Sequence, residues 1–519
     1  MHDLVIDNAL VVDGLGGPAR EGGVAVKDGR LAAVGRDLGA ARERVDAQGL
    51  VLAPGIVDIH THYDAQLTWD PFATPSTALG VTTVVIGNCG FTIAPCRPGD
   101  RDLTLRNLTH VEGMSLEALR AGVNWDFESY PDFLRAMERR GVVPNVASFA
   151  GHSSVRTYVL GADATRRVAT DAEIAEMRRL VVEALRAGAI GFATSTAEQH
   201  NGENGIPMPS RLADDREMRA LAGALGEVGR GVFMITKGMT TSVPWLEEIA
   251  AASGRPVMIA AMFVDPGDPT RVFRELGEIE AARARGRELW AQVGCFPLGM
   301  EFTLRHPYPL EAFFAWRPAI EAAGEAQYRQ VLADPSFRQK LTEEAGIPGV
   351  PNRFSDKTWP HLSIMEVTRP EHRGLVGRTI EQLARESGRE PFDVFLDFGL
   401  DGELDAMFDC RLFNTDEDEV TRLLRHPHAA VALSDAGAHL SFLCDAGFGL
   451  HLLGHWVRER GDLTLEEAVK RVTSDVAAAY RIKDRGRLVP GAWADLLLFD
   501  PKTVARGDKR RVNDLPAGA

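Results

Sequence analysis

The sequence predicts an α/β protein, a TIM-like (β/α)8 barrel with a small β-sandwich built from both chain termini. Eight short apolar segments alternate with helical patterns through the middle of the chain, which is typical of βαβ units. The two ends carry short alternating strands separated by turns. One stretch before the last apolar segment is too long for a single crossover, which predicts a helical insertion before strand eight.

The β-sandwich is expected to combine residues 1–54 with residues 482–519. Residues 3–52 form short apolar runs separated by turn residues, and Asp28-Gly29 predicts a tight hairpin because both central residues of a primed turn need positive φ. Residues 486–500 alternate like a returning pair of strands.

The barrel is expected to span residues 55–481, with the insertion at about residues 300–425. Helices are predicted over 171–187, with Asp171 as the N-cap, and over 213–228, because both show amphipathic spacing. Eight strands are the number that closes a TIM barrel. The predicted strands are 56–62, 82–88, 145–150, 189–195, 231–237, 256–262, 288–294 and 429–435.

The composition excludes several classes of protein. Of 519 residues, 45% are hydrophobic and 25% are charged, as in an ordinary globular protein and unlike a disordered chain or a coiled coil. The formal net charge of −15 argues against a nucleic-acid surface or an anionic-membrane binder, because either needs a basic patch. The five cysteines are too few and too scattered to staple the chain, and the N-terminus does not resemble a signal peptide or a membrane span. We therefore expect a cytoplasmic protein.

The sharpest motif is Gly55-Ile56-Val57-Asp58-Ile59-His60-Thr61-His62, on the first barrel strand. Side chains at i and i+2 share one face of a strand, so His60 and His62 point together toward the mouth of the barrel. Two imidazoles on one face form half of a metal site, although a bare His-X-His is also compatible with a polar pair near a strand end. The position after a Pro-Gly turn and an apolar run favours the metal site.

Two further residues are predicted at the ends of neighbouring strands. Closure of the barrel places strand eight beside strand one, so Asp435 in Ser-Asp-Ala-Gly-Ala-His would lie next to the histidine pair. A carboxylate there can ligate a metal and accept a proton from water, whereas the alternative is a helix N-cap. Cys89, after strand two, is either a metal ligand or a small buried hydrophobic residue.

Several motifs together resemble the amidohydrolase superfamily, in particular its N-acyl-D-amino-acid deacylase (D-aminoacylase) branch. The motifs are GIVDIHTHYDAQ, IGNCGF, GHSSVR, SDAGAH and the C-terminal run from LTLEEAVKRV to LLLFDP, and the likeness extends from near residue 3 to near residue 505. The resemblance implies a zinc-dependent hydrolase of an amide bond. It also implies metal ligands at His60, His62, Cys89 and Asp435, with Asp435 as the general base and acid.

The chain departs from that family where two more zinc histidines are usual, at the ends of strands five and six. These strands read Phe-Met-Ile-Thr-Lys and Val-Met-Ile-Ala-Ala-Met-Phe, and no histidine occurs between His200 and His306. We therefore expect one divalent ion rather than two. The family's Lys and Arg that hold the substrate carboxylate are also not evident, so Lys237, His152 and Arg156 become candidates, against the alternatives of a strand-end lysine, a helix cap and a surface arginine.

Further substrate-binding candidates are Tyr63, beside the histidine pair, His200, in the loop after strand four, and His439, after Asp435. The insertion is rich in aromatic residues, which either line an apolar acyl pocket or form the insertion's own core. These residues are Phe302, Tyr308, Phe313, Phe314, Trp316 and Trp359.

Three functions remain open at this point. The leading hypothesis is a metal-dependent hydrolase of a linear amide, with a small-molecule N-acyl (D-)amino acid as the default substrate. The second is a cyclic-amide hydrolase of the same superfamily, against which strand four has no lysine to carboxylate. The third is a non-catalytic ligand-binding relative, against which the chain keeps His60, His62 and Asp435. The sequence leaves open whether the protein forms a homo-oligomer.

Overall fold

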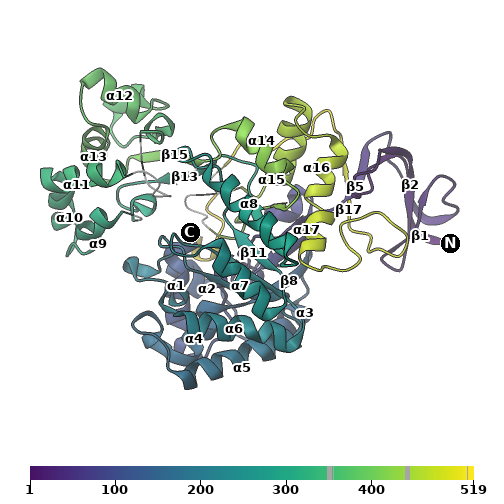
Figure 1. Cartoon of the computed structure of the whole chain (residues 1–519). Coiled ribbons are helices and arrows are strands. Elements are labelled where there is room, and N and C mark those ends of the chain that lie inside the picture. The colour runs from purple at the N-terminus through teal and green to yellow at the C-terminus, as the bar shows by residue number, and fades with distance from the viewer. Residues whose placement is uncertain are drawn as a thin grey trace.

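The computed structural model describes residues 1–311, 313–347, 354, 356–438, 443, 445–510 and 512–518. His439, one of the candidate substrate-binding residues, lies outside this described part. Figure 1 shows a central barrel, with strands from the N-terminal region on one side and the insertion on the other. Within the described ranges, no helix has both the length and the apolar character needed to cross a lipid bilayer.

The centre of the molecule is a sheet of eight parallel strands in the order β16-β12-β11-β10-β9-β8-β7-β6. Each segment predicted to be a barrel strand overlaps one of them, although β7 begins one residue earlier and β8 ends one residue later than predicted. Thr61 and Ala436 form a parallel bridge, so the first and last strands meet just beyond their ends. The barrel prediction is therefore confirmed. The strands are β6 Ile56–Asp58, β7 Val81–Ile86, β8 Asn145–Gly151, β9 Gly191–Ser195, β10 Val232–Thr236, β11 Val257–Ala260, β12 Leu289–Val293 and β16 Ala429–Val431.

The first and eighth strands are shorter than predicted. β6 ends at Asp58 and β16 ends at Val431, so His60, His62 and Asp435 lie on loops beyond the carboxyl ends of the strands. The chain leaves the ladder after β16 because Leu433 and Asp435 adopt φ of 68° and 48°, a left-handed conformation that no strand uses. These loops are where barrel enzymes place their active sites.

Helices cover the outside of the barrel (Figure 1). The expected N-cap of α5 (Asp171–Ala187) was wrong by one residue, because Thr170 is the cap and Asp171 is the first helical residue. Thr170 forms a capping box with Glu173. The other barrel helices are α1 Arg101–Val111, α2 Leu116–Gly122, α3 Tyr130–Arg140, α4 His152–Leu160, α6 Asp215–Val228, α7 Val243–Ser253, α8 Arg271–Ala284, α14 Glu417–Arg425, α15 Phe448–His451, α16 Leu465–Arg471 and α17 Ser474–Ala479.

Strands from both ends of the chain form one six-stranded sheet, in the order β17-β5-β1-β2-β3 with β4 paired to β1. Asp28 and Gly29 have φ of 51° and 73° between β2 and β3, as the hairpin prediction requires. Residues 486–500 supply one strand rather than the expected pair, since Pro490 and a left-handed Gly491 interrupt the segment. The domain boundaries stay a prediction. The strands are β1 His2–Val11, β2 Arg20–Lys27, β3 Arg30–Gly35, β4 Ala41–Asp46, β5 Val51–Pro54 and β17 Leu496–Phe499.

The insertion carries a small antiparallel sheet as well as the predicted helices. The sheet has the order β13-β15-β14, and its helices pack around a separate hydrophobic core. Figure 1 shows this unit at the upper left, attached to the barrel through β13 and β15. Its elements are β13 Leu298–Phe302, α9 Arg317–Ile320, α10 Glu325–Ala333, α11 Pro335–Ala345, β14 Leu362–Glu366, α12 Ile380–Ser387, α13 Pro391–Asp401 and β15 Met407–Phe413.

Candidate metal centre

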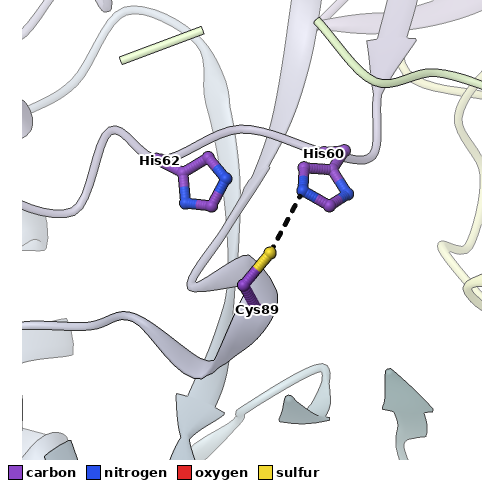
Figure 2. Close-up of side chains that lie close together, drawn as sticks. All are labelled: His60, His62 and Cys89. Atoms are coloured by element: carbon purple, nitrogen blue, oxygen red, sulfur yellow. Dashed lines mark hydrogen bonds between the residues drawn. The ribbon is translucent and has the colours of Figure 1, made fainter. Parts of the chain in front are cut away.

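The loop after β6 brings His60 and His62 to one centre, although neither lies within the strand. Figure 2 shows both imidazoles beside the thiol of Cys89, and their ring centroids are 5.2 Å apart. Several hydrogen bonds hold this loop. The Asp58 carboxylate accepts from the backbone N–H of His60 at 3.2 Å, the backbone N–H of Thr61 donates to the Val85 carbonyl at 3.1 Å, and the backbone N–H of His62 donates to the Ala436 carbonyl at 2.8 Å. The loop is thus tied to its own strand, to the second strand and to the loop after the eighth strand.

Cys89 and Asp435 complete a set of four donor atoms. The Cys89 Sγ lies 3.6 Å from His60 Nε2. The Asp435 Oδ1 lies 3.2 Å from His60 Nε2 and 3.5 Å from His62 Nε2. Ligand atoms of His60, His62 and Cys89 all fall within 4.8 Å of one another. The structure therefore brings together all four residues predicted from the sequence as metal ligands.

The two ligands that follow β7 and β16 have unusual backbones. Cys89 has a φ of 57° and Asp435 a φ of 48°, both in the left-handed region that non-glycine residues rarely adopt. Such conformations cost about 1–3 kcal/mol each and persist only where the surroundings impose them, most often at functional sites. Here they turn the two side chains toward the histidine pair.

A second layer of side chains orients the imidazoles. His60 Nδ1 lies 2.7 Å from Gln292 Oε1, and His62 Nδ1 lies 3.3 Å from Glu112 Oε1. In both rings the Nδ1 atom faces an acceptor and the Nε2 atom faces the common centre. Partners of this kind usually fix ring orientation at metal sites.

The electrostatics of the centre favour a thiolate. Burial alone would raise the pKa of Cys89, but the imidazoles of His60 and His62 outweigh it and lower that pKa below its usual value. Burial would likewise lower the pKa of His62, but the carboxylates of Glu112 and Asp435 raise it well above its usual range. Deprotonated sulfur is the form that binds metals.

Two buried aspartates form hydrogen bonds that hold the loops around the metal centre. Burial raises the pKa of Asp58 and of Asp64 to about 7. Asp58 accepts from the Ser434 hydroxyl, and Asp64 accepts from the Gly87 backbone N–H at 2.8 Å. These bonds join the loops of the first, second and eighth strands.

The donor set fits zinc. Two imidazole nitrogens, one thiolate sulfur and one carboxylate oxygen are ligands that zinc accepts, and four is its preferred number. A set of carboxylate and carbonyl oxygens alone would suit magnesium or calcium instead.

A cavity of about 310 Å³ opens beside the centre, and His60, Cys89 and Asp435 form part of its wall. Of the candidate substrate-binding residues, His200 and Lys237 line it. His200 Nδ1 contacts the Ser195 hydroxyl at 2.6 Å, and Lys237 Nζ donates to Glu275 at 2.7 Å. The apolar part of the wall comes from Met239, Met262, Phe263, Leu298, Met300, Pro309, Leu412, Phe413, Leu433 and Leu443.

Three other candidates lie away from this cavity. His152 and Arg156 are fully buried, and both contact Glu217 on α6, His152 at 2.8 Å. Arg156 is thus neither a surface arginine nor part of the cavity wall. Tyr63 is fully buried, and its hydroxyl lies 2.8 Å from the Ser76 hydroxyl. These positions favour packing roles over substrate contact.

Most aromatic residues of the insertion take one of the two expected roles, lining the cavity or forming the insertion's own core. Tyr308 lines the cavity, whereas Phe314 is exposed to solvent. The remaining four, Phe302, Phe313, Trp316 and Trp359, belong to the insertion's own core.

Neither of the extra family histidines has a replacement at its strand end. β10 ends at Thr236, whose hydroxyl lies 3.1 Å from the Cys89 Sγ, and β11 ends at Ala260. In the described part of the chain, the only group of three or more His, Cys, Asp or Glu side chains close enough to hold a metal is the one at His60, His62 and Cys89.

Sequence reasoning missed Gln292 and Glu112. Gln292 is a polar residue in an otherwise apolar barrel strand, which is a signal that could have identified it. Glu112 directly follows α1, and no spacing relates it to His62.

Comparison with known proteins gives a consistent result. A family model described as "Amidohydrolase family" matches residues 43–517. D-aminoacylase from Alcaligenes xylosoxydans xylosoxydans is 31% identical over 97% of this chain and 89% of its own length. N-acyl-D-aspartate deacylase from the same organism is 30% identical over 97% of this chain and 86% of its own length.

Solved structures agree. N-acyl-D-glutamate deacylase from Bordetella bronchiseptica, complexed with zinc and a phosphonate inhibitor, has a TM-score of 0.67 and 26% identity, covering 97% of this chain and 91% of that one. A D-aminoacylase with a binuclear metal center has a TM-score of 0.66 and 28% identity over the same shares. The chain therefore belongs to the amidohydrolase family, as its motifs predicted.

Proposed function

We propose that this protein hydrolyses the linear amide bond of an N-acyl amino acid, by default the D enantiomer, with one divalent metal ion at His60, His62, Cys89 and Asp435. The observation that carries the proposal is the convergence of four donor atoms beside the 310 Å³ cavity, whose wall includes His60, Cys89 and Asp435. The relatives named as D-amino-acid deacylases support the choice of substrate. We propose zinc because the donor set suits it.

The residues divide the chemistry between them. When bound, a divalent ion supplies Lewis-acid activation of water and of the scissile carbonyl. Asp435, which borders the cavity, takes a proton from the attacking water and delivers it to the leaving nitrogen. The apolar wall of the cavity holds the acyl group or the amino-acid side chain and excludes bulk water.

One ion suffices for this scheme. Thr236 and Ala260 end the strands at which the family usually places the histidines of a second site, and neither side chain is a good zinc ligand. The D-aminoacylase relative is described as having one-metal activation and second-metal attenuation, so a single ion is compatible with hydrolysis.

Elemental analysis followed by a substrate panel tests the proposal. We expect about one zinc per chain and turnover of N-acyl-D-amino acids. Two ions per chain would contradict the single metal site. Hydrolysis of cyclic amides but not of N-acyl amino acids would show that the protein is a cyclic-amide hydrolase instead. Metal-free protein that binds N-acyl compounds without turnover would instead support the non-catalytic alternative.

Substitution of Asp435 tests the general base. Asp435→Asn keeps the size of the side chain but removes its basicity, so we expect kcat to fall by about 10²-fold or more. Asp171→Asn, at an exposed position on α5, is the matched control and should keep wild-type turnover. Full activity of Asp435→Asn would reject Asp435 as the base.

A further inference from the structure

We infer that Gln292 is the positioning residue of the metal centre, because its side-chain amide holds His60 in the tautomer whose Nε2 atom carries the free lone pair. This inference rests on the proposed metal site. Gln292 lies on β12, the strand next to the eighth strand, and is fully buried.

The contacts of Gln292 determine which way its amide faces. Its Nε2 atom lies 3.3 Å from the carbonyl oxygen of Ile59 and 2.6 Å from the hydroxyl of Tyr480. A backbone carbonyl oxygen can only accept a hydrogen bond, so the amide nitrogen must be the group that faces Ile59. The reversed amide would place two acceptors against each other.

The orientation of the amide then determines the tautomer of His60. Gln292 Oε1 lies 2.7 Å from His60 Nδ1, and an amide oxygen can only accept, so Nδ1 must be the donor. A neutral imidazole carries one N–H, so a proton on Nδ1 leaves Nε2 with its lone pair. The alternative tautomer would direct an N–H group at the centre and could not bind a metal.

The lone pair of Nε2 faces the other proposed ligands. Cys89 Sγ lies 3.6 Å and Asp435 Oδ1 lies 3.2 Å from this atom. Tyr480, itself 1% exposed, supports the amide from the side away from His60. His62 has a different partner, the Glu112 carboxylate, so the loss of Gln292 should disturb only one of the two imidazoles.

Variants of Gln292 test whether zinc binding requires a hydrogen-bond acceptor opposite His60 Nδ1. Gln292→Met has a similar size but offers no comparable acceptor, so zinc affinity of the metal-free protein should fall by about 10- to 100-fold. Gln292→Glu still accepts from Nδ1, although its second oxygen faces the Ile59 carbonyl, so it should keep more zinc affinity than Gln292→Met. Tyr480→Phe should also keep it, because the Ile59 carbonyl still orients the amide. Competition with a chelator measures the dissociation constants, and the Co²⁺ spectrum should change only for Gln292→Met.

Two results would overturn the inference: wild-type zinc affinity in Gln292→Met, or equal losses in the Met and Glu variants. A measurement on the wild-type chain removes any dependence on how the variants fold. In metal-free protein with ¹⁵N-labelled histidine, at a pH at which this imidazole is neutral, long-range nitrogen–proton spectra should show a proton on Nδ1 alone for His60, assigned by its loss in His60→Ala. An Nε2 proton on the neutral ring would also overturn the inference. If the wild type shows the expected tautomer but binds no zinc, the proposed function fails, although the orientation of His60 by Gln292 is confirmed.

Discussion

At the scale of single residues, two buried side chains, Gln292 and Glu112, contact the imidazoles of the proposed metal centre. The proposed ligands could be predicted from the sequence, but these two partners could not. His60 and His62 are two residues apart, and Asp435 follows the last apolar segment, so spacing and barrel closure relate them. Gln292 lies 232 residues from His60 and Glu112 lies 50 residues from His62, and no local pattern connects such pairs. The same limit applies to the backbone at Cys89 and Asp435, since nothing in the residue types indicates a positive φ.

The charge of the cavity wall predicts a substrate preference. Lys237 is neutralised by Glu275 at 2.7 Å, and Arg271 pairs with Asp265 at 3.5 Å. Apolar side chains form much of the remaining wall, which also carries the carboxylate of Glu198, so we expect N-acetyl-D-leucine to be a better substrate than N-acetyl-D-aspartate. Glu275→Gln would release the charge of Lys237 for an acidic side chain. A hydrogen bond to a charged group contributes about 1.5–3 kcal/mol, so kcat/KM for the aspartate compound should rise by about 10- to 100-fold relative to the leucine compound.

Glu278→Gln provides the control for this change. Glu278 is exposed on the same helix, α8, and does not line the cavity. Its substitution should leave the ratio of the two kcat/KM values as in the wild type. An unchanged ratio in Glu275→Gln would show that this ion pair does not select against acidic substrates.

At the scale of elements, the positions of strands and helices could be predicted more reliably than their ends. Each of the eight barrel strands overlaps its predicted segment, and only β7 and β8 extend one residue beyond it, because apolar runs between amphipathic helices mark buried parallel strands. The predicted ends of β6 and β16 were wrong. The apolar pattern continues past Asp58 and Val431, but the residues that follow are not part of either strand. GHSSVR correctly indicated the family, but its His152 and Arg156 turn inward and contact Glu217 on α6.

The buried network of His152, Arg156 and Glu217 leads to a stability prediction. All three side chains are inaccessible to solvent, so Glu217→Ala leaves the Arg156 charge buried without its partner. We expect a loss of about 3–5 kcal/mol in the free energy of unfolding. Thermal or denaturant unfolding measures the loss. KM of the protein that remains folded should not change, because the network lies outside the cavity wall.

Two variants sharpen this test. Glu248→Ala removes an exposed ion pair with Arg219 and should cost less than about 1 kcal/mol. The double change Arg156→Met with Glu217→Leu removes both charges and should be less damaging than Glu217→Ala alone. A strong rise in KM for Glu217→Ala would instead indicate that His152 or Arg156 contributes to substrate binding.

At the scale of the whole molecule, the centre joins distant parts of the chain. Its proposed ligands follow the first, second and eighth strands, so a bound ion would link the point at which the barrel closes. The insertion contributes Leu298, Met300 and Tyr308 to the cavity wall. In Figure 1 the insertion lies on the side of the barrel opposite the strands of the N-terminal region.

Removal of the metal should therefore lower the stability of the whole protein. Binding to the folded state alone stabilises it by about 2.7 kcal/mol when the free ion is at 100 times its dissociation constant. We expect the Tm to fall after chelation and to recover when zinc is added back. The double variant His60→Ala with His62→Ala should show no zinc-dependent shift. A zinc-dependent shift of wild-type size in that variant would place the stabilising ion elsewhere.

The sequence by itself determined the barrel and its insertion and indicated the four residues that we propose as metal ligands, because the period, length and order of apolar segments can be read along the chain. Only the tertiary structure decided where the strands end, that His152 and Arg156 face inward, that Lys237 pairs with Glu275, and that Gln292 and Glu112 lie beside the imidazoles. Those features depend on distances between side chains far apart in the sequence. Packing, rather than any pattern along the chain, sets such distances.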